Sequence, residues 1–100
     1  MPVVVRYQAK PDRADENQQL IEAVFADLEA RGTKGFTYQV LRLDDGVSFI
    51  HVVVEDESAE DPDSLADVPA FQAFTKDIAD RCDVQPNPMR ATEVGHHLGT

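Results

Sequence analysis

Apolar positions near the N-terminus follow a strand pattern and then a helical one. The run from residue 3 to residue 9 is β-branched and aromatic, and Pro11 ends it, which predicts a strand. The next segment carries apolar residues at spacings of three and four, which predicts a helix with one apolar stripe. Asp12 is its expected N-cap, and Gly32 its expected C′ residue after Arg31. The stripe consists of Leu20, Ile21, Val24, Phe25 and Leu28.

Two further β-rich runs, Phe36 to Leu43 and Val47 to Val54, are separated by Asp-Asp-Gly. Asp-Gly suits a two-residue hairpin turn, because both central residues tolerate positive φ. With Asp45-Gly46 as the turn, the strand period of two fixes the pairing and the faces. The expected cross-strand pairs are Arg42 with Phe49, Val40 with His51, and Tyr38 with Val53.

The second half of the chain predicts one more helix and one more strand. Apolar residues recur at helical spacing from about Pro69 to Arg81, and Pro suits the first turn of a helix. Pro86 and Pro88 are expected to stop this helix, and Met89 to about Leu98 is expected to form the last strand. The order predicts a single α+β domain over residues 1–100. Its expected fold is a ferredoxin-like β-α-β-β-α-β sandwich, with two helices on one face of a four-stranded antiparallel sheet.

Both faces of the predicted hairpin are largely apolar, although two helices can cover only one of them. The face opposite His51 carries Leu41, Leu43, Ile50, Val52 and Val54. An exposed apolar patch of that kind usually marks an interface, and a two-fold homodimer is the commonest solution. We therefore expect a homodimer, built by packing two sheets face to face; a monomer with a mixed, wet face is the alternative.

The composition limits the kinds of binding partner to expect. The chain of 100 residues carries a net charge of −10, which disfavours nucleic acid and anionic membrane surfaces. No apolar run is long enough to span a membrane and the start lacks a signal-peptide pattern, so we expect a cytoplasmic protein. The single cysteine, Cys82, is expected to be a small buried residue. Residues 55–63 are expected to form a solvated acidic loop, and we expect no metal site, since the neighbouring His96 and His97 point to opposite sides of a strand.

Tyr38, Arg42 and His51 are the candidate catalytic residues. The hairpin register places all three on one face, where a phenol, a guanidinium and an imidazole could bind an anionic or phenolic ligand. His51 could serve as a general base, because histidine titrates near neutral pH. The alternative is that these residues only make hydrogen bonds in the core or at an interface. The candidate ligand-binding residues are Phe36, Val40 and Phe49 beside them, with Phe71 and Phe74 if a cavity lies between helices and sheet. Of Arg6 and Tyr7, which point to opposite faces, only one can join such a site.

The pattern resembles the dimeric α/β-barrel superfamily, and within it the antibiotic-biosynthesis-monooxygenase-like domain. The residues that carry the resemblance are Val3 to Tyr7, Lys10-Pro11, Gly35 to Tyr38, Ser48 to His51 and Pro69 to Phe74. The resemblance implies a homodimer. It also implies either cofactor-independent oxidation of polycyclic phenols to quinones, or haem degradation, or a role not known.

Three departures from the active members of that family narrow these activities. The chain has no tryptophan, the segment from Phe71 to Arg81 has no histidine for haem iron, and Asn17 and Asn87 are not expected on a strand. We therefore set haem aside and expect no cofactor. Two functions stay open. One is a monooxygenase acting on a small aromatic or polyketide-like substrate through Tyr38, Arg42 and His51. The other is a homodimer without catalytic activity, which either binds a small hydrophobic or phenolic ligand or is purely structural.

Overall fold

The computed structural model describes residues 2–99. The strands are β1 (Val3–Ala9), β2 (Phe36–Arg42), β3 (Ser48–Glu55) and β4 (Cys82–Arg90). The helices are α1 (Ala14–Arg31), α2 (Pro69–Lys76) and α3 (Ile78–Arg81), with short 3₁₀ turns at Pro11–Arg13 and Leu65–Asp67.

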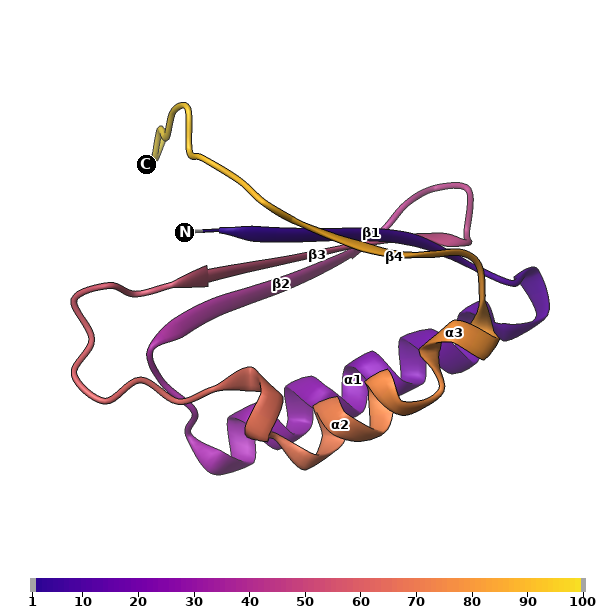
Figure 1. Ribbon diagram of the computed structural model, residues 1–100, viewed down its shortest axis with the longest axis horizontal. Coiled ribbons are helices and arrows are strands. Elements are labelled where there is room, and N and C mark those ends of the chain that lie inside the picture. Colours follow the sequence, from indigo (N-terminus) through magenta and orange to yellow (C-terminus); the bar gives the residue numbers. More distant parts are fainter. Residues whose placement is uncertain (1, 100) are drawn as a thin grey trace.

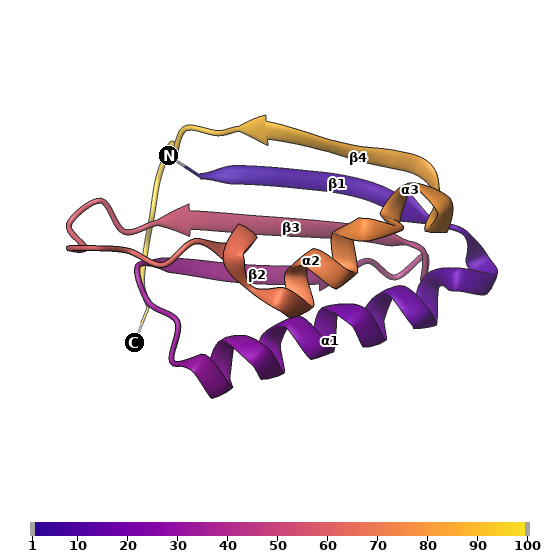
Figure 2. The ribbon, with the colours of Figure 1, turned by 60° about the horizontal axis from the view of Figure 1, so that its bottom comes forward.

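The four strands form one antiparallel sheet in the order β2-β3-β1-β4. All three helices lie on one side of this sheet, with α1 beside α2 (Figures 1 and 2). This is the ferredoxin-like α+β arrangement that the sequence predicts. The second predicted helix is divided at Asp77 into α2 and α3. The edge strands are β2 and β4, so β1 and β3 occupy the middle of the sheet.

The predicted hairpin register is confirmed, but its turn is longer than expected. Arg42 pairs with Phe49 and Val40 with His51, as the sequence indicates. Beyond these pairs the Leu43 N–H still donates to the Ser48 carbonyl, but the Leu43 carbonyl accepts from the Gly46 N–H, so residues 44–47 form the turn. Only Gly46 takes a positive φ in this turn. The Asp45 carboxylate accepts bonds from the backbone N–H groups of Val47 and Ser48, which stabilises the wider loop.

The start of α1 also differs from the sequence prediction. Asp12 lies inside the 3₁₀ turn that begins at Pro11, so its carboxylate does not cap the helix. The N-cap position is held by Arg13, whose guanidinium instead pairs with Glu16 one turn on. The other end is as predicted: Gly32 adopts the left-handed conformation, with φ of 60°.

The last strand begins seven residues earlier than predicted, at Cys82 instead of Met89. Pro86 and Pro88 lie within it, which an edge strand tolerates because one side of its backbone needs no ladder bonds. Asn87 is therefore on a strand, contrary to expectation, and pairs with Arg6 on the face away from the helices. Residues 91–99 form no regular element and run on the side of the sheet opposite the helices (Figure 1).

The two faces of the sheet have different environments. The core lies between sheet and helices, where Tyr7, Val24 and Phe49 are almost completely buried. The other face has no helix over it (Figure 1), and Leu41 and Met89 there are 44% and 62% exposed. We call this second surface, formed by the outward side chains of all four strands, the open face.

Replacement of Gly35 by alanine is expected to destabilise the fold by more than the 1–2 kcal/mol that a left-handed residue typically costs. Gly35 has a φ of 98°, and an added Cβ would collide with Pro62, lying 2.7 Å from its Cα. The matched control is Gly32→Ala, because a Cβ there meets nothing within 4 Å at a φ of 60°. Urea denaturation measures both; equal losses would contradict the close packing of Gly35 on Pro62.

Candidate functional site

A hydrogen-bonded triad of Tyr7, His51 and Tyr38 crosses the middle of the core. The Tyr7 hydroxyl lies 2.8 Å from His51 Nε2, and the Tyr38 hydroxyl lies 2.7 Å from His51 Nδ1. The three side chains come from β1, β3 and β2, and the sheet register places them on the helix-covered face. Tyr7 is therefore the residue of the pair Arg6 and Tyr7 that joins the site. The structure thus brings together two of the predicted catalytic residues, Tyr38 and His51.

Phenylalanine rings enclose this triad. Phe74 stacks on His51 with ring centroids 5.4 Å apart, and Phe71 meets the Tyr38 ring edge-on at 6.4 Å. Phe25 of α1 stacks on Tyr38 at 5.0 Å, and Phe49 stacks on Tyr7 at 5.5 Å. The polar tips of the triad therefore lie in an apolar, aromatic layer, where an uncompensated charge is costly.

Burial shifts the titration of all three members. Desolvation lowers the pKa of His51 to about 4, so its imidazole is neutral at physiological pH. Desolvation also raises the pKa of Tyr7 and of Tyr38 well above the ordinary range. His51 does not titrate near neutral pH as the sequence suggests, because the aromatic layer excludes the water that would solvate the imidazolium.

Two buried polar residues that the sequence pattern does not assign to the site extend the triad. Asn17 of α1 has an exposed fraction of 0% and Arg81 of α3 has 1%. Asn17 donates to the Tyr7 hydroxyl at 2.9 Å, and Arg81 Nε donates to Asn17 Oδ1 at 3.2 Å. The sequence carries one indication that Asn17 is buried: it lies three residues after Ala14 and four before Ile21, on the same face of α1. Arg81 lies in the last helical turn, a position where a cation is often exposed near the negative end of the helix dipole, but its guanidinium points into the core.

Arg42, the third predicted catalytic residue, lies apart from the triad. Its guanidinium bonds to the Gly46 carbonyl, to Asp15 and to Gln18, and it lies 5.5 Å from the centre of the Phe49 ring. Arg42 lines a hollow of about 310 Å³ between α1 and the β2 edge. The predicted residues Val40 and Phe49 line the same hollow, together with Phe25.

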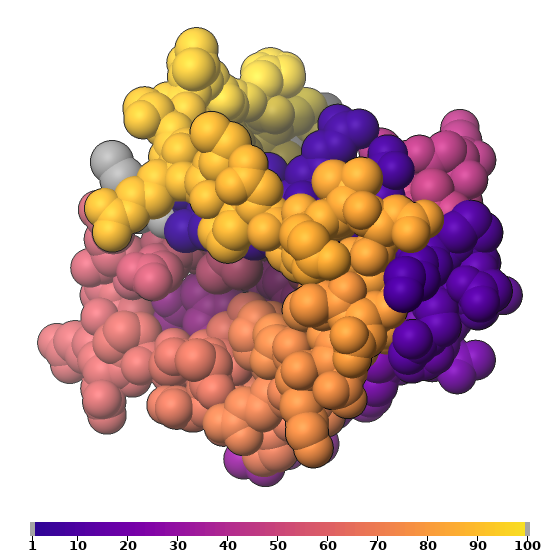
Figure 3. Space-filling model, turned by 45° about the vertical axis from the view of Figure 1, so that its right-hand side comes forward, coloured from indigo at the N-terminus to yellow at the C-terminus, as the bar shows by residue number. Residues whose placement is uncertain are grey.

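The other predicted ligand-binding residues are divided between the core and a second hollow. Phe36 lines a hollow of about 320 Å³ with Val53 and residues 62–66. Phe71 and Phe74 pack on Tyr38 and His51 in the core. Figure 3 shows the surface hollowed between α2, in orange, and the strands, with purple and magenta atoms of deeper segments at its floor. The helix-covered side of the sheet is thus the side on which the predicted residues gather.

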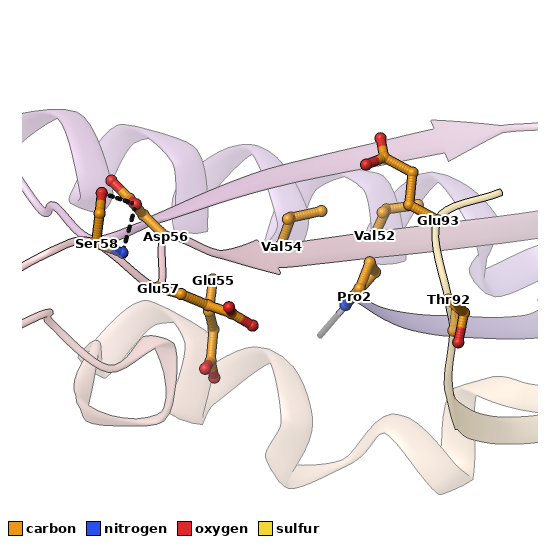
Figure 4. Close-up of a pocket in the computed structure, with 10 residues that line it drawn as sticks. Pro2, Val52, Val54, Glu55, Asp56, Glu57, Ser58, Thr92 and Glu93 are labelled. Carbon is orange, nitrogen blue, oxygen red and sulfur yellow. Dashed lines mark hydrogen bonds between the residues drawn. The ribbon is translucent and has the colours of Figure 1, made fainter. Parts of the chain in front are cut away.

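A larger hollow, of about 740 Å³, lies elsewhere. Val52, Val54, Pro2 and residues 91–93 line it on the open face, with several carboxylates at its rim (Figure 4). Successive strand residues point to opposite faces, so the sheet separates this hollow from His51. Within residues 2–99, no group of three or more metal-ligating side chains is close enough to hold an ion. No helix in that range has the length and apolarity that a bilayer crossing demands.

Comparisons with solved structures show what this fold is similar to. Rv0793 from Mycobacterium tuberculosis superposes with a TM-score of 0.69 at 15% identity, over 94% of this chain and 97% of that one. A candidate antibiotic biosynthesis monooxygenase from Bacteroides thetaiotaomicron superposes with a TM-score of 0.73 at 17% identity, over 100% of this chain and 94% of that one. Another from Nitrosomonas europaea gives 0.72 at 10% identity, over 93% and 88%. No protein-family model and no curated protein matches the chain. The resemblance predicted from the sequence is therefore confirmed at the level of the fold.

Acid is expected to destabilise the protein through His51. From pH 7 to pH 5 the free energy of unfolding should fall by about 2 kcal/mol. The reason is that the histidine binds a proton with a pKa of 6.5 in the unfolded chain, whereas buried His51 binds one only near pH 4. The contribution of neutral His51 to stability is thus fully present above the pKa of the unfolded histidine, 6.5, and is lost as the pH falls towards the folded value of about 4. Urea denaturation at fixed protein concentration measures this dependence.

The variant His51→Gln should remove most of this pH dependence, because an amide does not titrate. Its amide can still bond to both phenols, which favours a folded variant. The control His97→Gln, in the exposed tail, should retain it. Carboxylates whose pKa is lowered, such as Asp27 and Asp45, change the stability only below pH 5. A wild-type stability that stays flat between pH 7 and pH 5 would contradict the burial of a neutral His51.

Proposed function

We propose that this protein binds a small aromatic, phenolic or polyketide-like compound between its sheet and α1–α2, and acts on it as a cofactor-independent monooxygenase. The observation that carries the proposal is the Tyr7–His51–Tyr38 triad, a set of polar groups enclosed by phenylalanine rings. Aromatic walls with a few convergent polar groups are typical of sites for small apolar ligands. The fold likeness to candidate antibiotic biosynthesis monooxygenases favours the same reading by analogy.

The proposed reaction converts a phenol and O₂ into a quinone and water. The phenol ring loses four electrons, one oxygen atom of O₂ becomes the new carbonyl, and the other leaves as water, so no external reductant is needed. The protein would bind the ring among Phe25, Phe71 and the hollow near Arg42, and exclude bulk water. Since both nitrogens of His51 are hydrogen-bonded, His51 acts on the ligand through Tyr38 and not as a free base.

The second candidate function is a homodimer without catalytic activity, serving as a ligand carrier or a structural protein. It is favoured by the same triad, because a pKa of about 4 makes His51 a weak base at neutral pH. Within residues 2–99, every buried side-chain polar atom already has a hydrogen-bond partner. A complete internal network of this kind also fits a core that is stabilised without performing a reaction.

The proposed monooxygenase activity is tested by measuring O₂ consumption with a dihydroxynaphthalene as substrate. We expect purified wild type to consume O₂ and form the quinone, and Tyr38→Phe and His51→Gln to slow this by roughly 100-fold, the usual contribution of a positioned proton donor or acceptor. His97→Gln is the matched control outside the site. Binding of the naphthol without O₂ uptake would favour the second candidate, and neither binding nor uptake across a panel of phenols would contradict both ligand-binding proposals.

The open face is expected to be covered by a second copy of this chain. Leu41 and Met89 are 44% and 62% exposed there, beside Val52 and Val54, and an apolar surface of this kind is typical of an interface. Replacing Leu41 and Met89 by lysine should weaken self-association by at least tenfold, because two copies would then bury like charges against each other. The control Ala30→Lys adds a charge on the exposed side of α1. Sedimentation across micromolar concentrations measures the mass, and a wild-type particle of 11.1 kDa would contradict the dimer.

A further inference from the structure

The polar chain through the core is longer than the triad and has a definite direction. It runs from Arg81 through Asn17, Tyr7 and His51 to Tyr38, by contacts of 3.2, 2.9, 2.8 and 2.7 Å. Each residue comes from a different element, and the first four are at most 4% exposed. We call these five side chains the relay.

The direction of the relay is set at its Arg81 end. A guanidinium can only donate, so the atom of Asn17 that faces it must be the amide oxygen. The amide nitrogen of Asn17 then faces Tyr7 and donates to its hydroxyl oxygen. The Tyr7 proton is left with one acceptor, His51 Nε2; if it pointed elsewhere it would be buried without a partner, which is unfavourable.

The rest of the relay follows from this first bond. Neutral His51 accepts at Nε2, so its own proton is on Nδ1 and is donated to the Tyr38 oxygen. The Tyr38 hydroxyl proton has no acceptor in the relay, and the Tyr38 oxygen makes no other hydrogen bond within residues 2–99. Tyr38 is also the only partly exposed member, on edge strand β2 beside Phe25 and Phe71.

The buried positive charge of Arg81 also favours donation along the relay towards Tyr38. The Arg81 guanidinium is 1% exposed and bonds to Asn17 and the Phe74 carbonyl, over whose ring it also lies. In the part of the chain that the structure describes, no ion pair joins it to a carboxylate. A buried positive charge at the inner end of a hydrogen-bonded chain favours negative charge at the outer end, and burial strengthens this effect.

We propose that Arg81 and Asn17 are positioning residues that fix His51 as the Nδ1–H tautomer, and that Tyr38 thereby presents its proton to an oxygen anion of the ligand. The ligand class is then a phenolate or enolate, bound by donation from Tyr38. This inference rests on the proposed function for the existence of a ligand, whereas the direction of the relay stands on the geometry alone.

Nitrogen-15 NMR of the His51 ring tests the direction without any ligand. At pH 7 we expect wild-type His51 to carry its proton on Nδ1. In Asn17→Asp, the carboxylate still accepts from Arg81 but now also accepts from Tyr7, so the relay should reverse and the His51 proton should move to Nε2. Because the new carboxylate pairs with Arg81, this variant should stay folded, and a merely structural role of Asn17 would not change the tautomer.

The variant Tyr7→Phe provides a second measurement, because it removes the donor to Nε2 and should release the preference for Nδ1–H. An Nε2–H tautomer in the wild type would overturn the inference. So would the same tautomer in wild type and in folded Asn17→Asp.

Binding of para-nitrophenol tests the anion. We expect the wild type to bind the phenolate at least tenfold more tightly than the phenol, seen as a lowered pKa of the bound dye. Tyr38→Phe and Asn17→Asp should lose that preference, whereas His97→Gln should keep it. Equal affinity for both forms would overturn the role of Tyr38 as anion donor and leave the ligand-binding function standing. No binding of either form, with the Nδ1–H tautomer intact, would instead overturn the ligand-binding function and retain the relay direction.

Discussion

The structure depends on the requirement that every polar group in a thin core has a hydrogen-bond partner. Tyr7, Asn17, Tyr38, His51 and Arg81 come from five different elements and bond to one another in sequence. Removing one member leaves its neighbours buried and unsatisfied, which is more costly than the loss of a single bond. The same requirement that holds the helices on the sheet therefore also orients the imidazole and the phenols. Stability and the chemistry of the site are not separable here.

The sheet divides the molecule into two surfaces with different physics. On the helix-covered face, aromatic rings exclude water and keep His51 neutral, while the net charge of −10 is carried largely by exposed carboxylates. On the open face, apolar side chains such as Leu41 and Met89 contact solvent in a single copy. A ligand on the first face and a second copy on the other would use the two sides independently. Such an arrangement would let one small domain combine a binding site with an interface.

Solved structures of similar fold share 10–20% identity with this chain, so they establish the scaffold and leave the chemistry to its own residues. Those residues were partly predictable. The pairing of Val40 with His51 and of Arg42 with Phe49 follows from centring the turn on Asp45-Gly46, because a four-residue turn with that centre keeps the register of a two-residue one. The separation of Arg42 from His51 does not, since it depends on Asp15 and Gln18, which only the packing of α1 brings to the β2 edge.

The sequence by itself determined the order of the elements, the strand register and the shared face of Tyr38 and His51, because these follow from local periodicity over a few residues. Tertiary structure alone decided that this face lies under the helices, that Pro86 and Pro88 belong to an edge strand, and that Asn17 meets Arg81. Those two residues are separated by 64 positions in the chain. A hydrogen bond between such distant residues leaves no periodic trace, because it is set by how α1 and α3 pack and not by either local sequence.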